Sequence, residues 1–211
     1  MFIAVEGVEC SGKSTLIQAI QQYGQDNHID MCLTREPGGT LIAEEIRSIL
    51  LSSKNQEVLH ADTELLLMFA SRVQHIHTVI KPALDRGQWV ISDRFVDASY
   101  AYQGGGRSIG FAVIDQLVEQ FIPHNLYPNY VLFMNAPLDV CLQRMYQRGQ
   151  LDRIEQESVD FFERVYHAYQ KRQTQEAERF IELDATLDQR ELTKQIGDIL
   201  CQITQTQGTP G

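Results

Sequence analysis

Short apolar runs alternate along the chain with longer segments that carry apolar residues every three or four positions. The short runs lack the in-and-out alternation of a strand with one face in water. They predict five strands, at residues 2–6, 30–34, 88–92, 130–134 and 179–183, of which 2–6 and 88–92 are expected to be buried. Strands of this kind are typical of a parallel sheet covered by helices on both faces.

The intervening segments have helical periodicity and predict helices at residues 13–23, 41–51, 61–86, 109–121, 137–147, 158–178 and 187–204. Pro82 lies inside the third of these, where a proline is expected to kink the helix. The glycine-rich stretch 103–107 predicts a loop, and the tail 206–211 is expected to fray. Because strands and helices alternate, we expect an α/β fold in a single domain, residues 1–211.

Composition limits the classes of partner. The net charge of −10 does not favour a nucleic-acid or anionic-membrane surface, so a phosphate site would need local positive groups. We find no apolar run long enough to span a membrane and no secretory signal pattern. The four cysteines form no C-x-x-C pair, which favours a reduced, cytoplasmic protein without zinc or disulfides.

The first predicted strand leads directly into a phosphate-binding motif. Residues 7–14 read GVECSGKS and fit G-x-x-x-x-G-K-[ST] without a mismatch. Gly7 and Gly12 permit close backbone approach, Lys13 supplies a charge to the phosphates, and the Ser14 hydroxyl is a ligand for Mg²⁺. The expected nucleoside triphosphate site comprises Gly7, Val8, Glu9, Cys10, Ser11, Gly12, Lys13, Ser14 and Thr15.

Charged residues also follow the second and third predicted strands. Arg35 follows the second, where it could grip a second anion, and Asp93 and Arg94 follow the third. An acid in this place can hold the metal through water, while the arginine faces a phosphate. A solvated loop charge and a local ion pair are the alternatives. Taken with the loop at residues 7–14, these residues favour a site for two phosphates.

Three further stretches resemble bacterial thymidylate kinases: TREPGG at residues 34–39, DRF at 93–95 and SYAYQGGGR at 99–107. The resemblance extends from residue 2 to about residue 204. It implies the nucleoside monophosphate kinase fold of P-loop NTPases, with a five-stranded parallel sheet, helices on both faces and a short lid at about residues 147–156.

The resemblance implies phosphoryl transfer from ATP to dTMP with Mg²⁺, giving ADP and dTDP for dTTP synthesis. Ser14 and Asp93 would lie at the metal, Asp184 near the adenine, and the chain would form a homodimer. Tyr102 would exclude a 2′-hydroxyl and Phe69 would stack on thymine, although either could instead be a core residue. The implied dTMP contacts are Glu9, Arg35, Phe69, Arg72, Arg94, Ser99, Tyr102 and Gln103.

The catalytic arginine does not occupy the same position in every member of this family. Some members of the family carry it in the P-loop directly after the acid, but here that position is Cys10. We expect Arg153 in the lid to supply the charge beside Lys13 and Arg94, with Arg148 as second candidate. A solvated charged loop is the alternative for this segment.

Two other functions are considered. A P-loop kinase for another nucleoside monophosphate is disfavoured by the combination of Phe69, Arg72, Tyr102 and Gln103. A nucleotide-binding switch has no use for a second phosphate clamp. A GTPase is expected to carry an N-K-x-D string, and the sequence has none.

Overall fold

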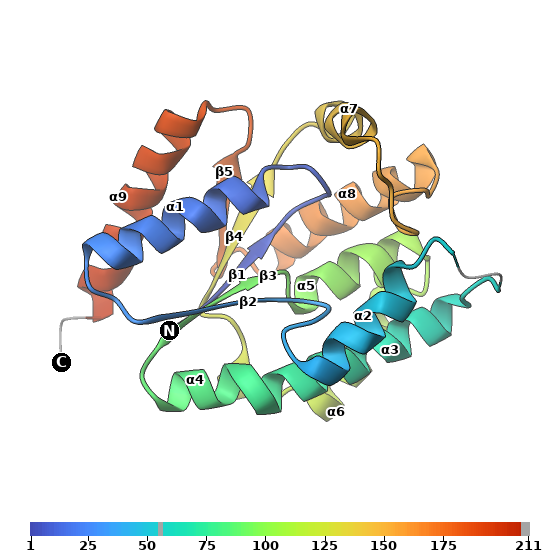
Figure 1. Ribbon diagram of the computed structural model, residues 1–211, viewed down its shortest axis with the longest axis horizontal. Coiled ribbons are helices and arrows are strands. Elements are labelled where there is room, and N and C mark those ends of the chain that lie inside the picture. The colour runs from blue at the N-terminus through green and yellow to red at the C-terminus, as the bar shows by residue number, and fades with distance from the viewer. Residues whose placement is uncertain (55–56, 208–211) are drawn as a thin grey trace.

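The sheet is parallel throughout. A computed structural model describes residues 1–54 and 57–207 and has five strands in the order β2-β3-β1-β4-β5 (Figure 1). The strands are β1 (Phe2–Glu6), β2 (Met31–Arg35), β3 (Trp89–Asp93), β4 (Tyr130–Asn135) and β5 (Phe180–Asp184). All five predicted strands are confirmed, each end within one residue of its expected position.

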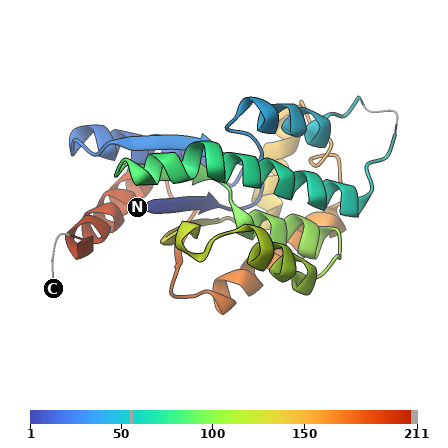
Figure 2. The same cartoon turned by 90° about the horizontal axis from the view of Figure 1, so that it is seen from below.

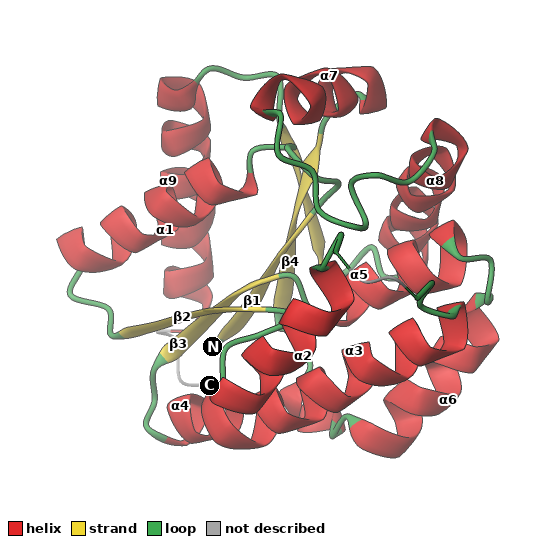
Figure 3. Cartoon of the chain, turned by 45° about the vertical axis from the view of Figure 1, so that its right-hand side comes forward, coloured by secondary structure: helices red, strands yellow, loops and turns green. Residues whose placement is uncertain are grey.

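The central strand β1 faces two cores, as its uniform apolar character predicts. Ile3 and Val5 contribute to the core beneath α1 (Lys13–Asp26) and α9 (Gln189–Gln207), which pack against each other on one face of the sheet (Figure 3). Phe2 and Ala4 point to the opposite core. Burial on both sides explains why β1 shows no alternation of polar and apolar residues.

The opposite face is covered by a long helical rod and by α6 (Phe111–Phe121). The rod consists of α3 (Ala61–His75), the π-helical η1 (Ile76–Ile80) and α4 (Lys81–Asp85), and it runs across most of the molecule when seen from below (Figure 2). The π-helical turns lie just before Pro82, which has no N–H to donate, so the predicted irregularity occurs there. Helix α2 (Leu41–Leu51) packs on α3.

The prediction of a loop at residues 103–107 is wrong. Short α5 (Val96–Ser99) leads into a π-helix, η2 (Tyr100–Gly106), which packs along α8 (Val159–Gln175). A Cβ on Gly105 would lie 2.5 Å from the Cβ of Ala168, and one on Gly106 would lie 2.5 Å from the Phe161 ring. The glycines therefore permit close helix packing and do not break the chain.

The remaining elements complete the sheet edge that carries polar loops. Helix α7 (Leu138–Arg148) includes residues 147–148 of the expected lid, and η3 (His124–Leu126) precedes β4. Residues 149–158 follow α7 and contain the rest of the expected lid, so we refer to them as the lid. Of the tail expected to fray, residues 206–207 continue α9 and residues 208–211 lie outside the described part. Among the described residues, we find no helix long and apolar enough to cross a membrane.

Candidate active site

The loop between β1 and α1 has the backbone that its glycines predict. Gly7 and Gly12 have φ angles of 145° and 105°, which favour glycine. A Cβ on Gly7 would also lie 2.7 Å from Ser11 Oγ and 2.8 Å from the Met134 carbonyl oxygen. No side chain caps the N-terminus of α1, so its first amides are suited to binding an anion.

Lys13 lies folded into this loop. Its Nζ donates to the carbonyl oxygens of Gly7 at 3.0 Å and Val8 at 2.9 Å. Burial, and then the nearby charge of Arg94, lowers the pKa of Lys13 to about 8. A triphosphate beside the ammonium would offset both effects, so the site is electrostatically suited to an anion.

Arg94 joins the P-loop to two tyrosines. Its Nη1 donates to the Gly7 carbonyl and to the Tyr169 hydroxyl, both at 2.9 Å, and its Nη2 donates to Glu9 Oε1 at 2.7 Å. Tyr102 donates to the other Glu9 oxygen and its ring lies 4.8 Å from the Arg94 guanidinium carbon. The structure thus brings three predicted site residues, Glu9, Arg94 and Tyr102, into one cluster.

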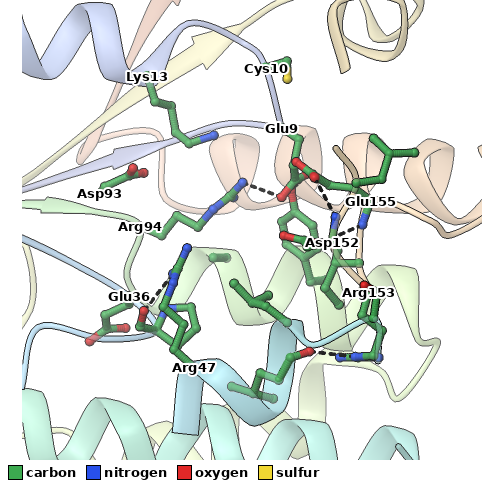
Figure 4. Close-up of a pocket in the computed structure, with 18 of the residues that line it drawn as sticks. Glu9, Cys10, Lys13, Glu36, Arg47, Asp93, Arg94, Asp152, Arg153 and Glu155 are labelled. Atoms are coloured by element: carbon green, nitrogen blue, oxygen red, sulfur yellow. Dashed lines mark hydrogen bonds and ion pairs between the residues drawn. The ribbon is translucent and has the colours of Figure 1, made fainter. Parts of the chain in front are cut away.

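A single cavity of about 1100 Å³ extends from the P-loop to this cluster and beyond it. Lys13 and Asp93 lie at one end, and Arg153 of the lid lies across from them (Figure 4). Tyr102 and Gln103 line the cavity, and so does Met68 of α3. Asp93 Oδ1 is buried without a hydrogen-bond partner.

The donors near the P-loop fit a divalent cation that takes most of its ligands from substrate and water. Ser14 and Asp93 both line the cavity, which offers one hydroxyl and one carboxylate with an unpaired oxygen. Within the described residues, no group of three or more His, Cys, Asp or Glu could hold a metal. This sparse oxygen set is suited to Mg²⁺ and not to a protein-caged metal.

Arg47 is a cavity residue that the sequence reasoning missed. It reaches from α2 toward Arg94 (Figure 4), and its Nη1 donates to the Pro37 carbonyl at 2.8 Å. Burial, followed by the charge of Arg35, lowers the pKa of Arg47. Its spacing could have indicated that it faces inward, because Arg47 lies four residues after buried Ala43 and three before buried Leu50 on the same face of α2.

Arg35 does not line the cavity. Its guanidinium donates to Glu44 Oε2 at 3.0 Å, and its side chain is 54% exposed. Arg47 and Arg94 do line the cavity, and their side chains approach each other (Figure 4). In this structure Arg35 is the last residue of β2 and forms a solvated ion pair with Glu44.

Arg72, Phe69 and Ser99 form a buried layer behind the cavity lining. Arg72 donates to Glu36 Oε2 at 2.6 Å, to Ser99 Oγ at 2.9 Å and to the Phe95 carbonyl at 2.9 Å. The Phe69 ring lies 5.0 Å from the Arg72 guanidinium carbon. Since these donors are engaged, Arg72 as placed here orients Glu36, which does line the cavity.

Gln103 and Glu64 form the wall opposite the P-loop. Gln103 Nε2 donates to Glu64 Oε1 at 2.8 Å, while Gln103 Oε1 is buried without a hydrogen-bond partner. Glu64 was also missed, since a carboxylate in the first turn of a predicted helix is ordinarily a solvated residue. Here it is 1% exposed, which indicates a specific role.

The lid arginines are placed differently from one another. Arg153 Nε donates to the Leu50 carbonyl, and Nη2 donates to Glu64 Oε2, both at 2.7 Å. Arg148 pairs with Glu155, and its side chain is 51% exposed. Burial raises the pKa of the Cys10 thiol, and the positive charge of Arg148 acts in the opposite direction. Arg148 thus lies on the P-loop side and Arg153 on the opposite wall.

Of the remaining predicted residues, some line the cavity and others lie around it. Asp184 accepts from the Thr186 amide at 2.8 Å and from its hydroxyl at 2.6 Å, which forms a turn after β5. Glu9, Cys10, Gly12, Lys13 and Ser14 line the cavity. The other predicted P-loop residues, Gly7, Val8, Ser11 and Thr15, do not contribute to its lining.

Comparisons with known proteins show which family the chain resembles. A family model for thymidylate kinase matches residues 5–196. The thymidylate kinase of Vesicomyosocius okutanii subsp. Calyptogena okutanii is 48% identical over 199 residues, covering 94% of this chain and 96% of the relative. That of Pseudomonas putida is 49% identical over 185 residues, 88% of each chain.

Similarity extends to solved structures. The crystal structure of thymidylate kinase from Ehrlichia chaffeensis matches with a TM-score of 0.74 and 30% identity, covering 95% of this chain and 97% of that one. These matches do not favour the two alternatives, a kinase for another nucleoside monophosphate and a nucleotide-binding switch. The chain therefore belongs to the thymidylate kinase family, and it is a nucleoside monophosphate kinase that phosphorylates dTMP to dTDP.

Proposed function

We propose that ATP is the donor and that ATP and dTMP occupy the cavity together, ATP on the P-loop and dTMP against the Arg94 side. The observation that carries this proposal is the single continuous cavity of about 1100 Å³. A site for one small molecule typically has about 300–1000 Å³. The P-loop occupies only one end, so the other end has room for an acceptor.

On the donor side, the P-loop amides and Lys13 would hold the β- and γ-phosphates. Ser14 and Asp93 would hold Mg²⁺, which would neutralise phosphate charge at this end of the cavity. The unpaired Asp93 oxygen supports this assignment. Lys13 is already fixed at the loop, so its charge needs little reorganisation on binding.

On the acceptor side, Arg94 and Arg47 would hold the phosphate of dTMP between them. A phosphate oxygen is already anionic, so the residues need to position and stabilise charge and do not need to remove a proton. Glu9 is fixed by Arg94 and Tyr102 and would face the sugar. The Tyr102 ring would leave a 2′-hydroxyl poorly solvated, which disfavours ribonucleotides.

The base would be recognised through Gln103. Its Nε2 is used by Glu64, which leaves Oε1 as an acceptor without a partner. Thymine carries an N–H at N3 and can donate to such an oxygen, whereas cytosine presents an acceptor there. The arrangement supports selection of thymine over cytosine.

We further propose a homodimer that works in the cytoplasm and binds neither nucleic acid nor membrane. Leu41 on α2 is 89% exposed and Leu66 on neighbouring α3 is 60% exposed, which supports a covered apolar surface. Cys10, Cys32, Cys141 and Cys201 are free thiols, in keeping with a reducing compartment.

Ligand-induced stabilisation tests the two-nucleotide site. We expect dTMP alone and a non-hydrolysable ATP analogue with Mg²⁺ to raise the Tm separately, and together to raise it further. Arg47→Ala should reduce the shift with dTMP and preserve the shift with the analogue. If the two ligands compete, so that each abolishes the shift given by the other, the cavity holds one nucleotide and the proposal fails.

A further inference from the structure

Glu64 lies where three segments of the chain meet. It is on α3, 1% exposed, and accepts hydrogen bonds from side chains of η2, of the turn after η2 and of the lid. Gln103 donates to Oε1 at 2.8 Å, Arg153 donates to Oε2 at 2.7 Å, and Arg107 Nε lies 3.1 Å from Oε2. One buried carboxylate thus joins a cavity amide to the lid.

The ionised Glu64 carboxylate determines the orientation of the Gln103 amide. Burial alone would raise its pKa, but the charge of Arg107 and the hydrogen bonds from Gln103, Arg107 and Arg153 outweigh burial, so the pKa is lowered. An ionised carboxylate only accepts hydrogen bonds. Gln103 must therefore turn its NH₂ group toward Glu64, and its carbonyl oxygen is left without a protein partner.

The second carboxylate oxygen docks the lid. Arg153 uses three donors on this wall: its amide donates to the Leu51 carbonyl at 3.1 Å, Nε to the Leu50 carbonyl, and Nη2 to Glu64. Leu50 and Leu51 end α2, where carbonyl oxygens lack helical partners. The lid is thus attached at the end of α2 and at Glu64 together.

We propose that Glu64 is a specificity-determining positioning residue that couples recognition of the pyrimidine to docking of the lid. The inference rests on the proposed function, in which Gln103 reads the base. A base with an N–H at N3 keeps the amide in its observed orientation. A base with an acceptor there would require the amide to turn, which would bring two oxygens together at Glu64 and disturb the carboxylate that holds Arg153.

The decisive variant is Glu64→Gln. The two arginines attract the new amide oxygen, so its NH₂ group faces Gln103 and forces the Gln103 amide to turn. We expect the ratio of kcat/KM for dTMP to that for dCMP to fall by about tenfold or more. We also expect hydrogen exchange in lid residues 149–157 to speed up, because a neutral amide oxygen holds the Arg153 guanidinium less strongly than the carboxylate does.

Three further variants test base recognition and lid docking separately. Arg153→Ala should release the lid and speed its exchange but keep the dTMP-to-dCMP ratio, since Gln103 still faces a carboxylate. Glu157→Gln is the matched control: it removes a carboxylate that pairs with Arg107 at 2.6 Å and touches neither Gln103 nor Arg153. It should leave the dTMP-to-dCMP ratio unchanged, and Glu64→Asp should restore part of that ratio.

The Tm of each variant shows whether it is folded. If Glu64→Gln does not fold, Glu64→Asp replaces it as the test variant. An unchanged substrate ratio in a folded Glu64→Gln protein would overturn the proposal, and so would unchanged lid exchange. Failure of the proposed function is a different result. In that case the wild-type enzyme itself would show no preference for dTMP over dCMP.

Discussion

Arg94 is held at the centre of the cavity by a chain of buried groups that begins behind it. The Tyr169 hydroxyl accepts from Arg94 and donates to Glu6 Oε2 at 2.8 Å. Glu6 is fully buried at the end of β1 and also accepts from the Phe95 amide at 2.7 Å. The carboxylate that precedes the P-loop therefore supports the arginine through a tyrosine.

Glu6 gives a pH dependence that can be measured. Burial, and then the charge of Asp97, raises its pKa from 4.5 to about 7. Between these values the folded protein binds more protons than the unfolded chain, so the Glu6 contribution to stability falls as pH rises from about 4.5 to about 7. Relative to Glu6→Gln, the wild type should lose up to about 3 kcal/mol of unfolding free energy between about pH 5 and 8. Urea denaturation of both proteins measures this, and parallel pH profiles would contradict it.

The lid arginines give a second prediction at this scale. Because Arg153 is engaged by the opposite wall and Arg148 lies on the P-loop side, we expect Arg148 to stabilise the migrating phosphoryl group. Arg148→Ala should lower kcat by about 10³, and Arg153→Ala by clearly less. Single-turnover kinetics measures this, with Arg190→Ala on exposed α9 as the control. The opposite order of effects would return the role to Arg153.

The sequence predicts well those residues whose chemistry depends on their immediate neighbours. The P-loop is such a case, since Gly7, Gly12 and Lys13 act through local backbone geometry. Arg47 and Glu64 were not predicted, because their roles depend on how α2 and α3 pack against the lid. The spacing of Arg47 from Ala43 and Leu50 indicates the buried face of α2, but no spacing in the chain indicates the cavity that Arg47 and Glu64 line.

At the scale of elements, uniform apolar runs gave reliable strands and glycines gave an unreliable loop. A strand buried on both faces is a short run of consecutive apolar residues, so the run itself indicates the strand. Glycine is ambiguous, because it serves turns and close packing alike. In η2 close packing against α8 decides the structure, and Tyr102 and Gln103 are held on a helix as a result.

Substitution of these glycines should therefore act through packing. We expect Gly105→Ala to destabilise the fold by about 1–3 kcal/mol, because the new Cβ would lie 2.5 Å from the Ala168 Cβ. Gly197 on α9 is the matched control, since a Cβ there meets nothing within 4 Å. Gly197→Ala should be neutral or stabilise by up to about 1 kcal/mol. Equal effects in chemical denaturation would contradict the packing role.

At the scale of the whole molecule, an acidic protein surrounds a cavity that carries charges of both signs. The net charge is −10, yet cationic side chains from several elements line the site. They are Lys13, Arg47, Lys54, Arg94, Arg144, Arg148 and Arg153, and the same lining carries the carboxylates Glu9, Glu36, Glu64, Asp93, Asp152 and Glu155. The cavity therefore does not share the large negative charge of the whole molecule, which favours the binding of anionic substrates there.

The exposed apolar residues of α2 and α3 predict that two copies of the chain associate through this surface. We expect the wild type to sediment as a dimer and Leu66→Glu to shift it toward monomer, because a charge would be buried in the interface. Val159→Glu, on α8 with 45% exposure, is the control and should remain dimeric. Analytical ultracentrifugation decides this. A monomeric wild type at micromolar concentration would contradict the assignment of this surface.

The central claim is that one cavity transfers phosphate from ATP to dTMP and reads the base through Gln103. The most direct measurement is ADP release in a coupled assay with Mg-ATP and dTMP, dUMP, dCMP, dGMP, AMP and TMP bearing a 2′-hydroxyl. We expect a strong preference for dTMP, and dCMP and the ribonucleotides should be poor substrates. Equal rates with dCMP, or ADP release that does not depend on the acceptor, would contradict it.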